Sequence, residues 1–393
     1  MTTVLLALLG MFGPFSIDTP FPAFVQMRED FGVGSAQMQQ VVSVYLISFA
    51  AMSLFHGPLS DAVGRKPVMV TGAAVYTLAS IGAALAPSLP LLLICRALQG
   101  ASAGAGTIVS RTVVRDLFEG PRAQRLMSAI AMIFGIGPAV APIIGGWLLQ
   151  LGPWPIVFWF LAIFGAFIAV SVLVLLPESH PPERRTPLRL DAILRNVVAA
   201  ARDRWFLVLT GANAFSFAAQ FLYIAGAPIL VVDILGLGEQ DFWQLFVPMV
   251  AAMVLGSFTN GRLAERVAGH RLITAGQGCS LTGATAAVLL AALPGTSGQM
   301  PWALVGLVMV AFGTGISMPV YQLALLDSFP NARGTAASVS TFLMLSLNSL
   351  LAGFVAPVAG RTMLAFSATS LGLLLLGITL WAVHRRHVMR GSP

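Results

Sequence analysis

The sequence predicts an all-α membrane protein in which 12 transmembrane helices form two pseudo-symmetric six-helix bundles. Three observations lead to this prediction. The chain of 393 residues is 57% hydrophobic and only 9% charged, whereas soluble domains carry about 25% charged residues. It contains twelve apolar runs, each near the roughly 20 residues that a spanning helix needs. A charged segment after the second run also recurs at the same place in the second half.

The twelve predicted spans lie in residues 3–24, 38–59, 68–87, 88–111, 124–151, 154–176, 205–234, 242–262, 272–293, 302–326, 336–360 and 362–383. The longest polar stretch separates six spans from six. We therefore expect an N-terminal bundle over 1–176, a cytoplasmic linker over 177–204 and a C-terminal bundle with a short cytoplasmic tail over 205–393. Residues 191–201 form either a short surface helix, because Leu194, Val197 and Val198 share one helical face, or a solvated linker.

Basic residues predict the orientation. Arg28 and Arg361 fall in odd-numbered connections and Arg96 falls inside a span, whereas the other 19 of the 22 lysines and arginines lie in even-numbered connections, the linker and the tail. Loops rich in lysine and arginine stay in the cytoplasm. We therefore expect a monomeric, multi-pass protein of a bacterial inner membrane with both termini cytoplasmic. The first apolar run has no basic segment before it, so we expect a retained helix and not a cleaved signal.

The composition also argues against nucleic acid, metal ions and cofactors as partners. The net charge of +7 is scattered over short loops, so we expect no nucleic acid. Cys95 and Cys279 lie far apart in apolar runs and match no metal-ligand spacing. We expect no metal and no cofactor. The apolar composition predicts that the chain's extended partner surface is the lipid bilayer.

The charged segment at residues 57–67 reads GPLSDAVGRKP, and residues 261–271 read GRLAERVAGHR. Charge is costly in lipid, so we expect loops at a membrane face. Gly57 and Gly64 would allow close approach and tight turning. Asp61 would cap a helix N-terminus or pair with a base. A loop that only sets topology is the alternative.

Asp18 is the only acidic residue deep inside a predicted span, between prolines that disturb the helix. Such residues are functional candidates by default, because a carboxyl at membrane depth can exchange a proton. Arg96 is the only basic residue deep inside a span, and both lie roughly 10 Å below the outer face at 1.5 Å per residue. Their shared depth allows a buried ion pair. A structural acid at Asp18 and a static anchor at Arg96 are the alternatives.

Three motifs make the chain resemble the major facilitator superfamily. Residues 57–66 match the loop motif G-x-L-[SA]-D-x-x-G-[RK]-[RK], and residues 92–100 match the fourth-helix motif L-x-x-x-R-x-x-Q-G. Residues 137–146 match the fifth-helix motif G-x-x-x-G-P-x-x-G-G of drug–proton antiporters, with Ala141 in place of the second glycine. Together with residues 17–23 and 111–118, these motifs resemble the Bcr/CflA branch, whose members export bicyclomycin, phenicols and sulfonamides.

The resemblance implies a proton-coupled multidrug exporter that works by alternating access, with small-molecule drugs and protons as its partners and the proton gradient as its energy source. It implicates Arg96 in proton transfer, and we assign the exchanged proton to Asp18 as the acid inside a span. It assigns gating to the charged loop and to a partner at the end of the fourth span. The gating residues are Gly57, Asp61, Gly64, Arg65, Lys66 and Asp116, with Asp116 expected to pair with Arg65. The antiporter helix is represented by Gly137, Pro138, Pro142, Gly145 and Gly146.

Polar and aromatic side chains within spans are candidates for the substrate cavity, because such groups suit hydrophobic, neutral or monocationic drugs. Ordinary packing between helices explains each of them equally well. The candidates are Tyr45, Phe49, Asn213, Phe217, Gln220, Tyr223, Tyr321, Gln322 and Asn348.

Three other function classes compete with drug export. A proton symporter or facilitator of a small metabolite would share the fold, although the fifth-helix motif favours export. An integral membrane enzyme would need catalytic groups gathered at one face. The five histidines are dispersed, so we do not expect an enzyme. A channel would need neither the proton-exchanging acid nor the repeat.

Overall fold

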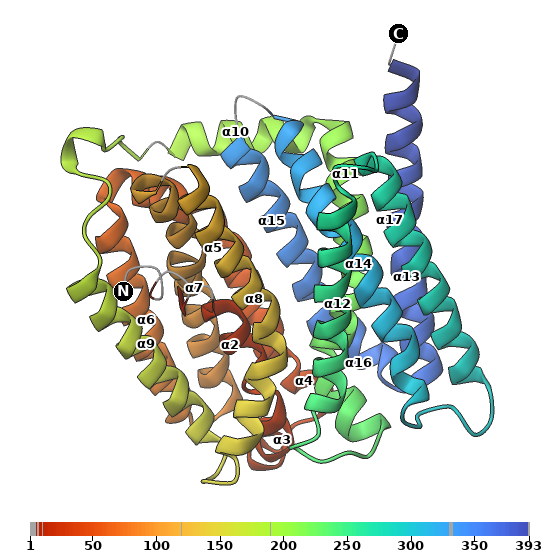
Figure 1. Ribbon diagram of the computed structural model, residues 1–393. Helices are drawn as coiled ribbons and strands as arrows, with labels where there is room; N and C mark the ends of the chain where they lie inside the picture. Colours follow the sequence, from red (N-terminus) through yellow and green to blue (C-terminus); the bar gives the residue numbers. More distant parts are fainter. Residues whose placement is uncertain are drawn as a thin grey trace. The chain divides into compact units, whose positions relative to one another are not determined.

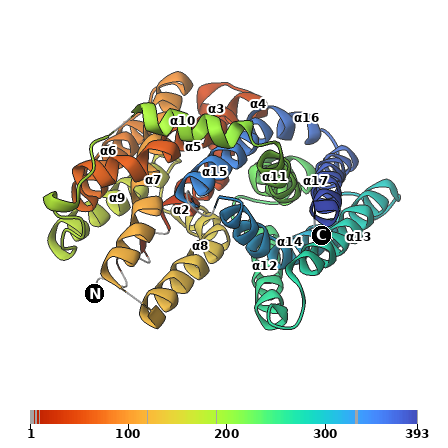
Figure 2. The same cartoon turned by 90° about the horizontal axis from the view of Figure 1, so that it is seen from above.

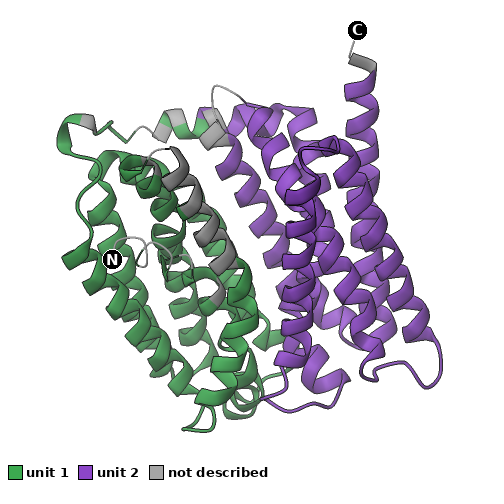
Figure 3. Ribbon diagram, viewed as in Figure 1, with its two compact units in different colours: residues 1–194 green, residues 195–393 purple. Residues whose placement is uncertain are grey.

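The computed structural model describes residues 5, 8, 9, 11–118, 120–188, 190–329 and 333–391. The chain divides into two compact units, unit 1 over Met1–Leu194 and unit 2 over Arg195–Pro393 (Figure 3). The division falls inside the polar stretch between the sixth and seventh predicted spans.

Unit 1 consists of helices joined by short connections (Figure 1). Its elements are α2 (Phe12–Asp18), the 3-10 turn η1 (Phe21–Ala23), α3 (Phe24–Phe31), α4 (Ser35–Met38), α5 (Gln40–Val63), α6 (Arg65–Ala84), α7 (Leu89–Leu117), α8 (Gly120–Leu148), α9 (Pro155–Leu175) and the 3-10 turn η2 (Pro182–Arg184). Helix α10 (Leu190–Arg202) follows and contains the boundary between the units, so residues 191–201 are helical and not a solvated loop.

Unit 2 is also helical in its described residues. Its elements are α11 (Arg204–Ala225), the π-helical turn η3 (Ile229–Ile234), α12 (Trp243–Leu263), α13 (Gly269–Ala292), α14 (Trp302–Asp327), α15 (Arg333–Leu350), the π-helical turn η4 (Leu351–Val355), α16 (Ala356–Ala359) and α17 (Met363–Gly391).

Ten of the described helical segments are long and apolar enough to cross a membrane, and they correspond to ten of the twelve predicted spans. The fifth span is represented by α8, whose apolar part is Gly135–Leu148. The first span, predicted over 3–24, lies partly outside the described residues, and its described part is broken between α2 and η1. Large apolar side chains on α9, such as Val174 at 70% exposure, suit contact with lipid.

The two units repeat one packing pattern. In unit 1, α5 packs along α7, and α6 packs between α7 and α9; in unit 2, α12 packs along α14, and α13 packs between α14 and α17 (Figure 2). A Cβ added at Gly100 of α7 would lie 2.1 Å from the Tyr45 carbonyl oxygen of α5. A Cβ at Gly315 of α14 would lie 2.2 Å from the Met253 carbonyl oxygen of α12. Equivalent helix pairs therefore approach backbone to backbone in both units, as expected for pseudo-symmetric bundles.

The predicted charged loop at 57–67 is a sharp junction between two helices. Helix α5 continues to Val63, and α6 begins at Arg65. Only Gly64 breaks the helical conformation, with a φ of +111° that side chains rarely adopt. The expectation that Gly57 shapes a loop is therefore wrong, because Gly57 lies inside α5 and a Cβ there would meet nothing within 4 Å.

Candidate functional site

Arg96 is the centre of a polar cluster inside unit 1. The side chain is fully buried on α7. Its Nε donates to the Val41 carbonyl oxygen of α5 at 3.0 Å, and its Nη1 donates to the Ser16 carbonyl oxygen of α2 at 2.9 Å. Nη1 also donates to Gln99 Oε1 at 2.8 Å. Arg96 thus joins three helices, and the acceptors compensate part of the cost of burying its charge.

Neighbouring side chains extend this cluster. The Arg96 guanidinium lies 4.5 Å from the centre of the Tyr45 ring, a cation–π geometry. The hydroxyl groups of Ser16 and Tyr76 are 2.6 Å apart, and Gln99 Nε2 donates to Ser80 Oγ at 2.7 Å. Arg96 Nη2 has no hydrogen-bond partner among the described residues. The cluster therefore keeps one unused donor in a buried setting.

Asp18 is the last residue of α2, and its side chain is only 2% exposed. Its Oδ1 has no hydrogen-bond partner in the part of the chain that the structure describes. The ion pair with Arg96 that their shared depth allows is not formed within 4 Å. The two residues are connected indirectly, because Arg96 binds the carbonyl of Ser16, two residues before Asp18.

Helix α8 packs directly onto the break that follows Asp18. A Cβ added at Gly145 would lie 2.1 Å from the Thr19 carbonyl oxygen and 3.3 Å from Pro22 Cδ. Only glycine allows this approach of the two backbones. The structure thus brings together the acidic residue and the fifth-helix motif, which the sequence placed in separate spans. Of the other motif positions, Gly137, Pro142 and Gly146 are buried and Pro138 is half-buried.

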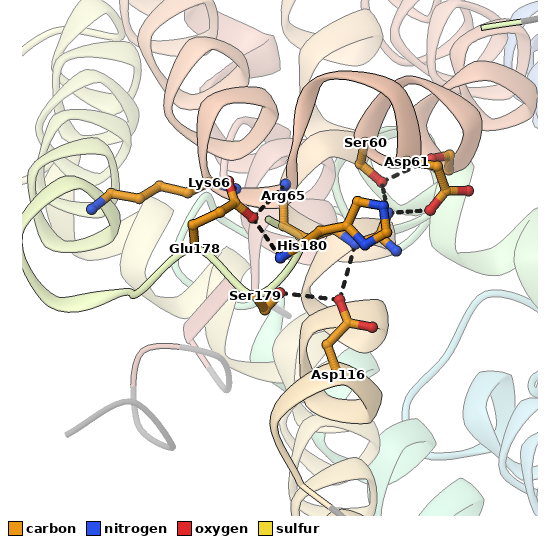
Figure 4. Close-up of polar contacts among 9 residues, drawn as sticks. Ser60, Asp61, Arg65, Lys66, Asp116, Glu178, Ser179 and His180 are labelled. Carbon is orange, nitrogen blue, oxygen red and sulfur yellow. Dashed lines mark hydrogen bonds and ion pairs between the residues drawn. The ribbon is translucent and has the colours of Figure 1, made fainter. Parts of the chain in front are cut away.

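A second polar site, the Arg65 cluster, is defined by Ser60, Asp61, Arg65, Asp116, Glu178 and Ser179 and joins α5, α6, α7 and the segment after α9 (Figure 4). The Arg65 side chain is 5% exposed. Its Nε donates to Asp116 Oδ2 at 3.0 Å, and its Nη1 donates to Ser60 Oγ and Asp61 Oδ1. The predicted contact between Arg65 and Asp116 is confirmed. Asp61 pairs with a base and is not a helix cap.

Glu178 takes the capping role, and the sequence analysis missed it. Its carboxylate accepts from the backbone N–H groups of Arg65 at 3.0 Å and Lys66 at 3.3 Å, at the N-terminus of α6. A negative charge is favourable there because the first N–H groups of a helix lack partners. The Lys66 side chain extends away from the cluster (Figure 4). The signal for Glu178 was the lone carboxylate at the end of the sixth span.

The nine predicted cavity residues are divided between the units. In unit 1, Tyr45 lies against Arg96, and its ring centre is 6.3 Å from that of Phe49. In unit 2, Tyr223 packs on the Phe366 ring of α17, with ring centres 5.1 Å apart. Tyr223 is therefore part of the packing between helices, while Phe217 is half-buried and Gln322 is exposed.

Other polar residues of unit 2 form a buried network. Gln277 Nε2 donates to Tyr321 Oη at 2.8 Å and to Ser216 Oγ at 3.2 Å, which joins α13, α14 and α11. Gln277 is a further member that the sequence analysis missed. The carboxamide oxygens of Asn213, Gln220 and Asn348 are buried without hydrogen-bond partners among the described residues. They come from α11 and α15, which pack together.

Comparison with known proteins shows which family and which relatives the chain is similar to. Residues 6–357 match the family described as the Major Facilitator Superfamily. The chain is 28% identical over 354 residues to a bicyclomycin resistance protein homolog of Haemophilus influenzae, covering 89% of this chain and 87% of that protein. It is 29% identical over 377 residues to multidrug resistance protein D of Escherichia coli, covering 95% and 93%.

Among solved structures, a bacterial homolog of the human lysosomal transporter Spinster, in an inward-facing and occupied conformation, has a TM-score of 0.75 at 15% identity. The alignment covers 98% of this chain and 96% of that chain. At this identity the likeness concerns the fold alone.

Proposed function

Because the chain belongs to the major facilitator superfamily, we propose that it exports small drug molecules from the cell in exchange for protons. The buried carboxyl of Asp18, with an unpaired Oδ1 at a helix break, carries this proposal. The protein spans the membrane many times. The names of its relatives, bicyclomycin resistance and multidrug resistance proteins, support drug export as the direction.

Asp18 is proposed to hold the exchanged proton. An ionised carboxylate needs water or a cation beside it, whereas the neutral acid tolerates a dry surrounding. In the outward-facing state Asp18 takes a proton from outside and drug is released. In the inward-facing state the carboxyl gives its proton to the cytoplasm and drug binds. One acid implies few protons per cycle, so neutral or monocationic cargo is expected.

Arg96 is proposed as a positioning residue for that exchange. Its bonds to Ser16 and Val41 hold α2 and α5 against α7. Its free Nη2 is a donor that an ionised Asp18 or a bound drug can use after a shift of α2. The contact of Gly145 with Thr19 couples α8 to the same break. A change in the charge of Asp18 would therefore alter the contacts among α2 and three neighbouring helices, α5, α7 and α8.

The Arg65 cluster is proposed to stabilise one state of the transport cycle. It joins four elements through hydrogen bonds to the carboxylates of Asp61, Asp116 and Glu178, and such charged bonds are worth more than neutral ones. Breaking it would free the end of α7 from the junction between α5 and α6.

We further propose that the protein is a monomer in a bacterial inner membrane and that both of its termini lie in the cytoplasm.

The cargo is proposed to be a lipophilic drug such as a phenicol, bicyclomycin or a sulfonamide. The unpaired carboxamide oxygens of Asn213, Gln220 and Asn348 would accept hydrogen bonds from such molecules. Phe217 and Phe221, with ring centres 6.0 Å apart, offer an aromatic surface on the same helix. A proton-coupled symporter or a facilitator of a small metabolite remains the alternative function.

Transport in reconstituted liposomes separates these functions. A proton gradient with an acidic interior should drive accumulation of a permanently charged lipophilic monocation or of a phenicol if the protein is an antiporter. A symporter would drive the same compounds outward, and transport by a facilitator would not depend on the proton gradient. Asp18→Asn should abolish gradient-driven accumulation, whereas Glu29→Gln, the same acid-to-amide change at an exposed residue, should preserve it. Full accumulation by Asp18→Asn would overturn the proposed role of Asp18.

A further inference from the structure

Unit 2 contains a groove between α13 and α17 that none of the predicted transport residues lines. Its volume is about 370 Å³. The two helices pack against each other (Figure 2). We propose that this groove binds one anionic phospholipid, with the acyl chain along the groove and the headgroup phosphate on Arg385 and Arg386.

The position of the arginines fits a headgroup. Arg385 lies about 33 Å along the helix axis from Met363 at 1.5 Å per residue, just past a hydrocarbon core of about 30 Å. Of the ten residues that line the groove, two are arginines and none is acidic. Neither arginine forms an ion pair with a described acidic side chain. Two free guanidinium groups at the headgroup level are complementary to a phosphate, which arginine binds with paired donors.

The lower part of the groove fits a hydrocarbon chain. Leu281, Ile378, Ala382 and Gly278 line it together with the indole of Trp381. From residue 274 to 281 the α13 side is about 10 Å long, so the groove holds the upper part of an acyl chain. A Cβ added at Gly278 would meet nothing within 4 Å, so the chain can approach the α13 backbone there.

The groove is a fixed feature because ring contacts hold α17 in place. Trp381 Nε1 donates to Thr274 Oγ1 at 3.3 Å, and the Trp381 ring packs edge-on against Tyr321, with centres 5.5 Å apart. Near the cytoplasmic end expected for the helix, the His387 ring stacks on Trp205 at 3.5 Å. These contacts set the rotation of α17 that presents both arginines to the groove.

Lipid titration of the purified full chain, followed by native mass spectrometry, tests the proposal. Phosphatidylglycerol should bind more tightly than phosphatidylcholine. The double variant Arg385→Gln with Arg386→Gln should lower phosphatidylglycerol affinity at least about tenfold, because each arginine near a lipid surface contributes about 1 kcal/mol. Arg262→Gln with Arg266→Gln removes the same charge from the α12–α13 segment, outside the groove, and should leave the affinity unchanged.

A second variant keeps both arginines and fills the groove. Gly278→Leu should weaken phosphatidylglycerol binding, whereas Gly372→Leu, at another open helical glycine outside the groove, should not. Equal losses in the groove variants and their controls would overturn the proposal by showing non-specific attraction. Binding of inorganic phosphate as tightly as the lipid would also overturn it, because the acyl chain would then contribute nothing.

Discussion

At the scale of single residues, the cap on α6 is the contact that most directly orders the Arg65 cluster. Glu178 accepts from the N–H groups of Arg65, Lys66 and His180. Glu178→Ala removes the acceptor of all three N–H groups and the charge next to the helix N-terminus. We expect the free energy of unfolding to fall by about 1 kcal/mol, as for the loss of a helix cap. Thermal unfolding in detergent, followed by tryptophan fluorescence, measures this loss.

Glu183→Ala is the matched control for this prediction. Glu183 is an exposed acid in the same segment, and no hydrogen bond of the described residues uses its carboxylate. Its replacement should leave the unfolding transition in place. Equal destabilisation by the two variants would contradict the capping role of Glu178.

The two glycines of the junction between α5 and α6 should respond oppositely to alanine. A Cβ at Gly64 would lie 2.7 Å from Glu178 Oε2, and the backbone there has a φ of +111°. Gly64→Ala should therefore lower the free energy of unfolding by about 1–3 kcal/mol. Gly57→Ala lies inside a helix with open space around it and should raise it by about 0.5–1 kcal/mol. The same unfolding assay reads both, and a tolerated Gly64→Ala would contradict this assignment.

The sequence could show which residues are unusual, but not which hydrogen-bond partners each of them has. Asp18 and Arg96 stand out because charges inside spans are rare. Two of the three acceptors of Arg96 are backbone carbonyls 55 and 80 residues away in the chain, and a backbone carbonyl carries no residue-specific signal. The absence of a direct ion pair between Asp18 and Arg96 could not be predicted for this reason.

At the scale of elements, the contact of α8 with the break after α2 is the most sensitive packing site near Asp18. Gly145→Ala would place a methyl group 2.1 Å from the Thr19 carbonyl oxygen, so the two backbones must separate. We expect a loss of about 1–3 kcal/mol in stability from overpacking, together with loss of proton-coupled transport. Liposome transport and thermal unfolding measure the two effects.

Gly372→Ala provides the comparison for Gly145→Ala. Gly372 lies in α17, and a Cβ there would meet nothing within 4 Å. This variant should transport as well as the parent protein. If Gly145→Ala also retained coupled transport, α8 would not be part of the coupling between the break and the rest of unit 1.

Helices were more predictable than their ends. Ten predicted spans have a counterpart among the helices long enough to cross a membrane, because long apolar runs are a strong signal. The end of α5 was placed too early, since polar residues such as Ser60 and Asp61 were interpreted as a loop. Their polarity is instead satisfied by Arg65 within the helix junction, a tertiary contact that local composition does not reveal.

At the scale of the whole molecule, the described residues of the two units repeat one helix-packing plan. The repeated charged segment indicated this plan because it follows the second span of each half. The chemistry is not repeated in the same way. Unit 1 holds the buried carboxyl and guanidinium, whereas the described core of unit 2 holds carboxamides, hydroxyl groups and aromatic rings. We therefore propose that unit 1 exchanges the proton and that unit 2 contributes neutral contacts to the drug.

The central claim is that Asp18 carries the proton that drug exchanges, and proton release on drug addition tests it most directly. Purified protein in weak buffer is mixed with phenicols, lipophilic cations and sulfonamides, and the pH change and the bound drug are both measured. The account predicts drug-dependent proton release by the parent protein and by Glu29→Gln, and drug binding without release by Asp18→Asn. Release of the same number of protons by Asp18→Asn would contradict it.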